Sequence, residues 1–191
     1  FEKTPDRLTI AEVKTGVNYA MIVSTNAGLW SYNLGDTVQF TSCDPYRVIV
    51  TGRITHFISA FGEHVIGKEV ETAIQKAMSE YNFSISEFTV AQKNSPPDDE
   101  LPYQEWFIEF EETPNNLDEI TFTIDKAMQE QNIYYKDLIE GNILQPLKIT
   151  SLTNGSFKEY MKSKGKLGGQ NKIPRLSNDR SIANQLLEFQ V

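Results

Sequence analysis

The sequence predicts an α+β protein in which a short β-rich part precedes a small α/β sandwich domain with helices packed on a mixed sheet. Two observations indicate this class. The N-terminal third contains short apolar runs separated by turn residues, as β-strands do. From residue 67 onward, segments with helical spacing alternate with strand-like segments. We expect the domain boundary to separate residues 1–57 from residues 58–191.

The first part is predicted to contain four short strands joined by turns. The run YAMIVST has the composition of a buried strand, and YRVIVTGRI alternates partly between apolar and other residues. The expected strands cover residues 19–25, 29–32, 36–41 and 46–54.

The stretch GLWSYNLGDTVQF, residues 28–40, places Tyr32, Gly35 and Asp36 between two of these expected strands. One interpretation is structural, because Asn33, Gly35 and Asp36 are common turn residues. The other is functional, because a carboxylate at a strand end can accept hydrogen bonds from the hydroxyl groups of a ligand. The stretch alone leaves both interpretations open.

The second part begins with a predicted helix over residues 67–81, whose apolar residues lie on one face at helical spacing. Further helices are expected over residues 117–131, 134–139, 156–163 and 181–189, and strands over residues 85–90, 103–112 and 144–152. Thr153 or Asn154 is the expected cap of the helix over residues 156–163.

Residues 103–112 (YQEWFIEFEE) alternate well between apolar and acidic side chains. The two expected faces carry Trp106, Ile108 and Phe110 on one side and Glu105, Glu109 and Glu111 on the other. This pattern is typical of a half-buried strand in an open sheet, with the glutamates in solvent.

Composition excludes several classes of function. The net charge of −8 argues against a general nucleic-acid or membrane-surface binder, and no apolar run approaches membrane-spanning length. The single cysteine, Cys43, forms no disulfide within the chain and is consistent with a cytoplasmic location. His56 and His64 lie eight residues apart without a third metal ligand nearby, so no metal site is expected.

The chain starts at Phe1 without methionine, and we expect it to be part of a longer protein.

Residues 52–63 (GRITHFISAFGE) lie where the two predicted architectures meet. Gly52 and Gly62 flank a strand-like core, which is consistent with a linker and a β-hairpin. The functional alternative is a hinge at which Arg53 and either Glu63 or His64 face a site.

Residues 158–175 (KEYMKSKGKLGGQNKIPR) carry six basic residues and one acidic residue, in a chain that is acidic overall. The glycines give flexibility and the lysines give charge, which is what binding and releasing a polyphosphate requires. The alternative is a solvated basic helix followed by a loose tail. No Walker-type loop, no GxGxxG fingerprint and no Ser-His-Asp elbow is present, and Asp98 and Asp99 are expected to be solvated.

Three stretches, NAGLWSYNLGDTV, FGEHVIGKEVE and SKGKLGGQNKIPRLSND, resemble bacterial members of the acyl-acid-amido synthetase family, named for the auxin-responsive Gretchen Hagen proteins of plants. This family is a branch of the adenylate-forming superfamily. Its enzymes use ATP and Mg²⁺ to convert a carboxylic acid into an acyl-adenylate, which an amino acid amine attacks to give an amide and AMP. The resemblance covers nearly the whole chain but only the C-terminal portion of the family's enzymes.

The resemblance implies a role for each matching residue. Asp36 would hold the ribose hydroxyls, Tyr32 and Gly35 would shape the turn beneath the nucleotide, and Arg53 would lie on the hinge side of the ribose. Lys172 matches the catalytic lysine, whose ammonium would stabilise negative charge at the α-phosphate or the acyl carboxylate.

The resemblance also implies a hinge at His56 and Phe57, where much of the superfamily has aspartate at the position of His56. His64 stands where plant relatives have a lysine and would face the nucleotide. Residues 1–57 would end the large adenylating domain, and residues 58–191 would form the small mobile domain.

The partners implied are a small acyl acid, an amino acid and the missing N-terminal domain, with no nucleic acid and no membrane. ATP and Mg²⁺ would be bound mainly by the absent portion, so we expect this chain alone to be inactive. Two alternatives stay open: a non-catalytic binding or regulatory module with the same small-domain fold, and an adenylate-forming enzyme with a thiol acceptor.

Overall fold

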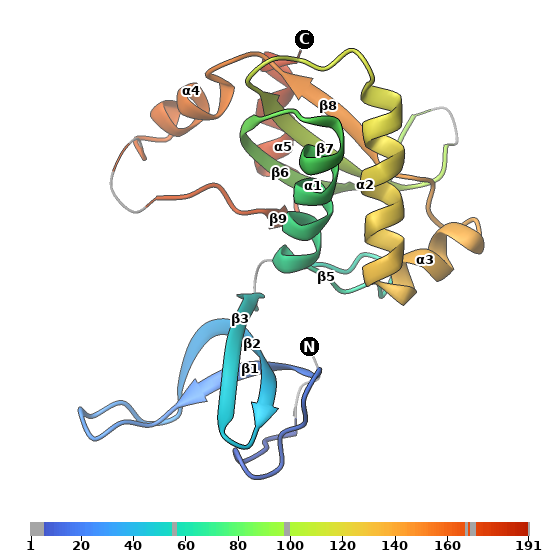
Figure 1. Ribbon diagram of the computed structural model, residues 1–191. Helices are drawn as coiled ribbons and strands as arrows, with labels where there is room; N and C mark the ends of the chain where they lie inside the picture. Colours follow the sequence, from blue (N-terminus) through green and yellow to red (C-terminus); the bar gives the residue numbers. More distant parts are fainter. Residues whose placement is uncertain (1–5, 55–56, 98–99, 167, 169–170, 191) are drawn as a thin grey trace. The chain divides into compact units, whose positions relative to one another are not determined.

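The computed structural model describes residues 6–54, 57–97, 100–166, 168 and 171–190 (Figure 1). The chain divides into two compact units, Phe1–Thr55 and His56–Val191. Each unit has its own sheet, so the two are described in turn.

The N-terminal unit is an antiparallel sheet with strand order β1-β2-β3. Its strands are β1 (Asn18–Val23), β2 (Tyr32–Cys43) and β3 (Tyr46–Arg53). The separate strands expected over residues 29–32 and 36–41 are therefore wrong, because residues 32–43 form one strand and residues 29–31 lie outside it.

A bulge explains why the turn residues of β2 do not end the strand. Gly35 has a φ of +77°, which a glycine adopts without strain. Its N–H donates to Asn33 Oδ1 at 2.9 Å, and the pairing with β1 shifts register between Ala20 and Ile22. β2 thus accommodates the bulge near Gly35 and continues as one strand.

The C-terminal unit is built on a mixed four-stranded sheet with order β8-β7-β6-β9 (Figure 1). β6 pairs with β7 antiparallel, whereas β9 and β8 are parallel to their neighbours. The strands are β6 (Ile85–Lys93), β7 (Tyr103–Phe110), β8 (Lys148–Leu152) and β9 (Leu176–Ser177). A two-stranded hairpin, β4 (Phe57–Ile58) with β5 (Val65–Ile66), precedes the first helix.

Helices cover both faces of this sheet, and each face has its own apolar core. The first face is packed by α1 (Gly67–Tyr81), α2 (Leu117–Gln131) and α3 (Ile133–Glu140). The second is packed by α4 (Ser156–Ser163) and α5 (Ser181–Leu186), with a 3₁₀ turn at Leu187–Phe189. The predicted α+β class is therefore confirmed.

The helices expected over residues 67–81, 117–131 and 156–163 are confirmed with the same bounds. The strand expected over residues 144–152 is shorter, because β8 begins at Lys148. Leu144 and Leu147 are nevertheless buried in the first core, so their apolar character reflects packing outside the strand.

The expectation that residues 103–112 form a half-buried strand is wrong. β7 lies in the middle of the sheet, and both of its faces are covered. Trp106 is buried in the core beneath α1 and α2, whereas Phe107 is buried on the α4 and α5 side. Glu105 and Glu109 are only 7% and 4% exposed, so they are buried charges that need partners.

Glu109 is partnered by the N-terminus of α4. Its two carboxylate oxygens accept hydrogen bonds from the backbone N–H groups of Gly155 (2.8 Å) and Phe157 (3.1 Å). Gly155 is the N-cap, with a φ of +88°, and no side chain at the cap position makes a capping hydrogen bond. The expected cap at Thr153 or Asn154 is therefore wrong, because a carboxylate from β7 binds these N–H groups.

Trp106 forms the centre of the first core. Its indole is fully buried and stacks on the Phe88 ring, with 5.8 Å between ring centroids and 9° between planes. This pair joins β6 to β7 on the face that α1 and α2 cover.

A buried carboxylate holds α3 against α2. Asp125 Oδ1 accepts hydrogen bonds from the Tyr135 hydroxyl (2.7 Å) and from the Leu147 N–H (3.2 Å). Gln129 donates to Asp125 Oδ2 at 2.6 Å. Burial, followed by the charge of Asp125, raises the pKa of Tyr135 well above its usual value.

We expect Tyr135→Phe to lower the free energy of unfolding at pH 7 by about 1–3 kcal/mol, because Asp125 loses a donor. A tyrosine with a raised folded-state pKa contributes stability below its unfolded pKa of about 10, and this contribution is lost as pH rises through the folded pKa. The wild type should therefore lose stability more steeply than the variant above about pH 10. Urea unfolding at several pH values measures both effects, and parallel pH slopes would contradict the prediction.

Candidate functional site

Asp36 and Arg53 come together where the last residue of β3 pairs with β2. Asp36 lies within β2 and not at a strand end as the sequence suggested, because β2 already begins at Tyr32. The two residues are partners in the β2–β3 register, and Arg53 Nε lies 3.2 Å from Asp36 Oδ1. The Asp36 side chain is 29% exposed and that of Arg53 is 61% exposed, so solvent reaches both. The arrangement presents a carboxylate acceptor from β2 beside a guanidinium donor at the end of β3.

Gly35 connects the β2 bulge to this pair. Its carbonyl accepts a hydrogen bond from the Ile54 N–H at 2.8 Å, which fixes the chain just beyond Arg53. Tyr32 begins β2 and is half exposed. The structure therefore brings together Gly35, Asp36 and Arg53, with Tyr32 on the same strand.

The hinge prediction falls at the start of the C-terminal unit. His56 lies outside the described residues, and Phe57 is the first residue of β4. His64 is exposed in the segment between β4 and β5 and has a φ of +46°.

Glu63 does not face a site, contrary to the functional alternative for residues 52–63. Its side chain is fully buried, and its carboxylate accepts hydrogen bonds from the N–H groups of Ala60 (3.2 Å) and Phe61 (2.8 Å). The Asn132 amide also donates to the Glu63 carbonyl at 2.8 Å. Glu63 therefore shapes the turn between β4 and β5.

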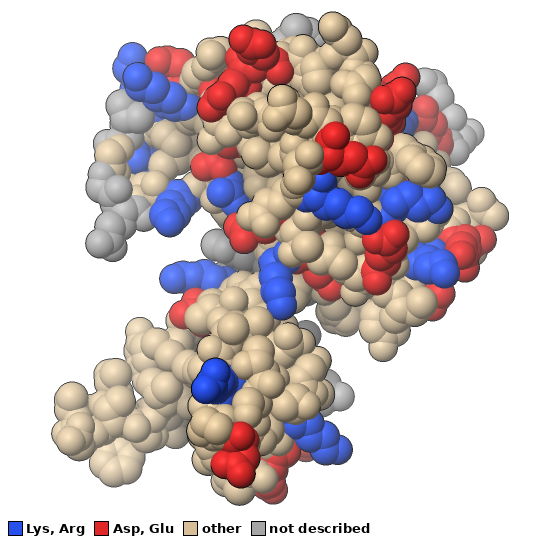
Figure 2. Space-filling model, in the orientation of Figure 1, with Lys and Arg blue, Asp and Glu red and all other residues tan. Residues whose placement is uncertain are grey.

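Lys172 lines a pocket in the C-terminal unit. The pocket has a volume of about 330 Å³ and lies between α4, the beginning of β6 and the segment that leads to β9. Lys158 and Lys166 line it together with Lys172. Figure 2 shows that basic side chains gather over α4 and the segment that follows it.

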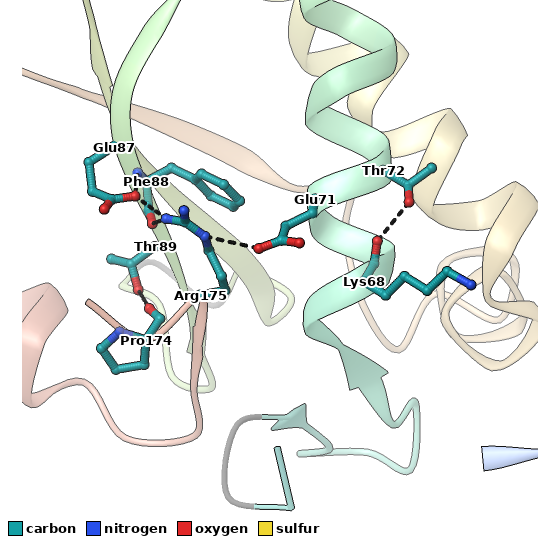
Figure 3. A network of polar contacts seen from close by, with 8 residues as sticks. All are labelled: Lys68, Glu71, Thr72, Glu87, Phe88, Thr89, Pro174 and Arg175. Atoms are coloured by element: carbon teal, nitrogen blue, oxygen red, sulfur yellow. Dashed lines mark hydrogen bonds and ion pairs between the residues drawn. The ribbon is translucent and has the colours of Figure 1, made fainter. Parts of the chain in front are cut away.

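Arg175 fixes the chain three residues after Lys172 (Figure 3). Its guanidinium donates to Glu71 on α1 at 3.2 Å, to Glu87 on β6, and to the Phe88 carbonyl at 3.1 Å. It also lies 4.6 Å from the centroid of the Phe88 ring. Arg175 thus joins α1 and β6 to the segment that carries Lys172.

Backbone contacts strengthen this attachment. The Thr89 hydroxyl donates to the Pro174 carbonyl at 2.7 Å, and the Val90 N–H donates to the Arg175 carbonyl at 2.9 Å. β9 then pairs with β6. Ile173 is buried in the second core, so the exposed Lys172 directly precedes an anchored segment.

The sequence interpretation missed Arg175 as an anchor, as well as the two lysines beside Lys172. Lys158, Lys166 and Arg175 all belong to the basic segment that was singled out. The partners of Arg175, however, lie on α1 and β6, and the pocket that the two lysines line is completed by residues of β6 and β7. A sequence motif gives no register for such long-range contacts.

The described residues contain no group of three or more His, Cys, Asp or Glu side chains placed to hold a metal ion. The helices within the described ranges are too short or too polar to span a bilayer.

Comparison with protein families gives two matches in sequence order. Residues 1–53 match the GH3 family central domain, and residues 68–181 match the GH3 family C-terminal domain. Similar curated proteins include the indole-3-acetic acid-amido synthetase GH3.3 of Arabidopsis thaliana, 26% identical over 179 residues, which cover 87% of this chain and 30% of that protein. The probable indole-3-acetic acid-amido synthetase GH3.2 of Oryza sativa subsp. japonica is also 26% identical, over 90% of this chain and 30% of its own length.

Among solved structures, the GH3.15 acyl acid amido synthetase superposes with a TM-score of 0.74 at 19% identity, over 96% of this chain and 36% of its own. The fold is therefore the one found in part of an acyl acid amido synthetase. The chain belongs to the GH3 family, which confirms the resemblance stated from the sequence. It spans about a third of the length of these relatives.

Proposed function

We propose that this chain is the C-terminal portion of an ATP-dependent acyl acid amido synthetase. The observation that carries the proposal is the succession of a GH3 central-domain match and a GH3 C-terminal-domain match in one chain. Relatives named as indole-3-acetic acid-amido synthetases support the reaction class. The whole protein, meaning this chain with the N-terminal portion proposed to precede it, would join an acyl acid to an amino acid.

The reaction has two steps. The acid's carboxylate oxygen attacks the α-phosphorus of ATP, the bond to the bridging oxygen breaks, and pyrophosphate leaves. The amino acid nitrogen then attacks the acyl carbon, a C–N bond forms, the bond to the phosphate oxygen breaks, and AMP leaves as the amine loses a proton.

Asp36 is the residue proposed to hold the ribose. Its carboxylate can accept hydrogen bonds from two hydroxyls, and its partial exposure beside Arg53, the last residue of β3, fits that use. Tyr32 and Gly35 would shape the backbone below the nucleotide. His64 would approach the nucleotide from the C-terminal unit.

Lys172 is the proposed catalytic residue. Its ammonium would stabilise the negative charge that builds up on the α-phosphate or the acyl carboxylate. Its exposure and the anchoring of its neighbours Ile173 and Arg175 support this role.

The two units are proposed to be parts of different domains, with residues 1–57 ending the large domain and residues 58–191 forming the mobile domain. A rotation of the mobile domain about His56 and Phe57 would then switch the protein from the adenylation step to the transfer step. Apolar side chains of the N-terminal unit remain exposed, with Trp30 at 83% and Val50 at 68%, which supports packing of the preceding portion against this sheet.

ATP and Mg²⁺ are proposed to bind mainly to that preceding portion. The described residues offer a partly exposed carboxylate and a lysine-lined pocket, but no cluster of metal ligands. The partners proposed are a small acyl acid and an amino acid in the cytoplasm, with no nucleic acid and no membrane.

The test is AMP release by the whole protein with a panel of acyl acids, with and without amino acids. Release that requires both an acid and an amino acid, together with a product amide in the mass spectrum, would support the proposal. Release that requires a thiol in place of the amine would indicate a thioester-forming enzyme. Absence of release with every acid would indicate a non-catalytic module.

A further inference from the structure

The pocket beside Lys172 has the chemistry of an anion site. Its polar lining residues include Lys158, Lys166, Lys172 and Ser86. Apolar side chains from α4 and the segment after it, Phe157, Met161 and Ile173, complete the wall. A volume of about 330 Å³ leaves room for a phosphate-bearing group.

The two acidic residues that line the pocket are already partnered inside the fold. Glu87 binds the Arg175 guanidinium, and its Oε1 also accepts from the Phe88 N–H at 3.1 Å. Glu109 accepts the Gly155 and Phe157 N–H groups at the start of α4. Both carboxylates therefore have hydrogen-bond partners that are not pocket lysines.

The three lysines, in contrast, form no ion pair with any described residue. Neighbouring lysines that do not line the pocket have partners: Lys162 lies 3.7 Å from Glu159, and the Lys164 ammonium lies over the Tyr160 ring. Three lysines without an ion pair therefore line one pocket, in a chain whose net charge is −8.

We propose that this pocket binds phosphate groups, and that Lys158 and Lys166 contact the same anion as Lys172. Lysine ammonium groups bind phosphate through charge-assisted hydrogen bonds, and three of them suit a multiply charged group. The chemistry fits both pyrophosphate and the phosphate of AMP. The inference deepens the role proposed for Lys172 and in this respect rests on the proposed function, although binding itself requires no catalysis.

Isothermal titration of the 191-residue chain with pyrophosphate, and separately with AMP, tests the proposal. We expect saturable binding of at least one of the two, and the comparison tells which source of phosphate the pocket prefers. Lys158→Ala and Lys166→Ala should each weaken binding by about tenfold, since each removes one charge-assisted contact. Lys162→Ala is the matched control on the same helix, and it should leave the affinity unchanged.

The proposal is overturned if neither ligand binds, or if Lys158→Ala and Lys166→Ala bind as the wild type does. It is also overturned if Lys162→Ala weakens binding equally, because the effect would then be general charge. Thermal unfolding of each variant identifies any that is misfolded, and Lys158→Gln and Lys166→Gln then replace it. Because no turnover is measured, phosphate binding without amide formation would reject the proposed function alone, and amide formation without such binding would reject this pocket alone.

Discussion

Lys172→Ala is expected to lower the rate of amide formation by the whole protein by about 10²–10³-fold, the usual effect of removing one well-placed donor to developing negative charge. The reason is local: Ile173 and Arg175 fix the chain beside Lys172, so no neighbouring lysine can take its position without moving the anchored segment. Steady-state AMP release at saturating ATP, acid and amino acid measures the effect. The fall should be in kcat, because the lysine is proposed to act mainly on the transition state.

Two variants control this experiment. Lys162→Ala removes an equal charge from the same basic segment but from outside the pocket, and it should keep the wild-type rate. Lys172→Arg keeps the charge but changes the donor geometry, so we expect an intermediate rate. A Lys172→Ala enzyme with wild-type kcat would remove this residue from the catalytic step.

Arg180→Met is expected to lower the free energy of unfolding by about 3–5 kcal/mol, because it leaves a buried carboxylate without its counter-charge. Arg180 Nη2 lies 2.5 Å from Glu105 Oε2, and the two side chains are only 17% and 9% exposed. Glu105 also accepts from the Thr150 hydroxyl at 2.8 Å, and Arg180 donates to the Gln92 carbonyl at 3.2 Å. Urea unfolding of the 191-residue chain measures the loss.

A double variant separates the unpaired charge from the lost packing. Arg180→Met combined with Glu105→Gln should recover part of the stability, since the remaining side chain is neutral. Lys76→Met removes one member of an exposed pair, Lys76 with Glu130, and should leave stability nearly unchanged. Equal losses for Arg180→Met and Lys76→Met would contradict the assignment of Arg180 as a buried partner.

The long helices of the C-terminal unit could be predicted from the sequence because their signal is local. In α1, Val70, Ala73, Ile74 and Ala77 recur at helical spacing and are all buried. The burial of side chains on the strands was harder to predict. Alternation of residue type separates the two faces of a strand, but it does not show which element covers each face. Glu105 and Glu109 alternate with apolar residues as solvent-facing side chains do, yet α4 and α5 cover them.

The candidate site divides in the same way. The sequence suggests Asp36, Arg53 and Lys172 as candidate site residues, because a motif records which residues occur and at what spacing. The contact of Asp36 with Arg53 depends on the register of β2 with β3, and the anchoring of Arg175 depends on a two-residue strand, β9. Such contacts join distant segments, and one sequence carries no record of their pairing.

The stacking of Trp106 on Phe88 has a spectroscopic consequence. The chain has two tryptophans, and one lies in each compact unit: Trp106 is fully buried, whereas Trp30 is 83% exposed. Indole emission shifts to shorter wavelengths in apolar surroundings, so the two fluorophores should differ in colour in the folded chain. The Trp30→Phe variant keeps only the fluorescence of Trp106, which follows unfolding of the C-terminal unit. The Trp106→Phe variant keeps only that of Trp30, which follows the N-terminal unit.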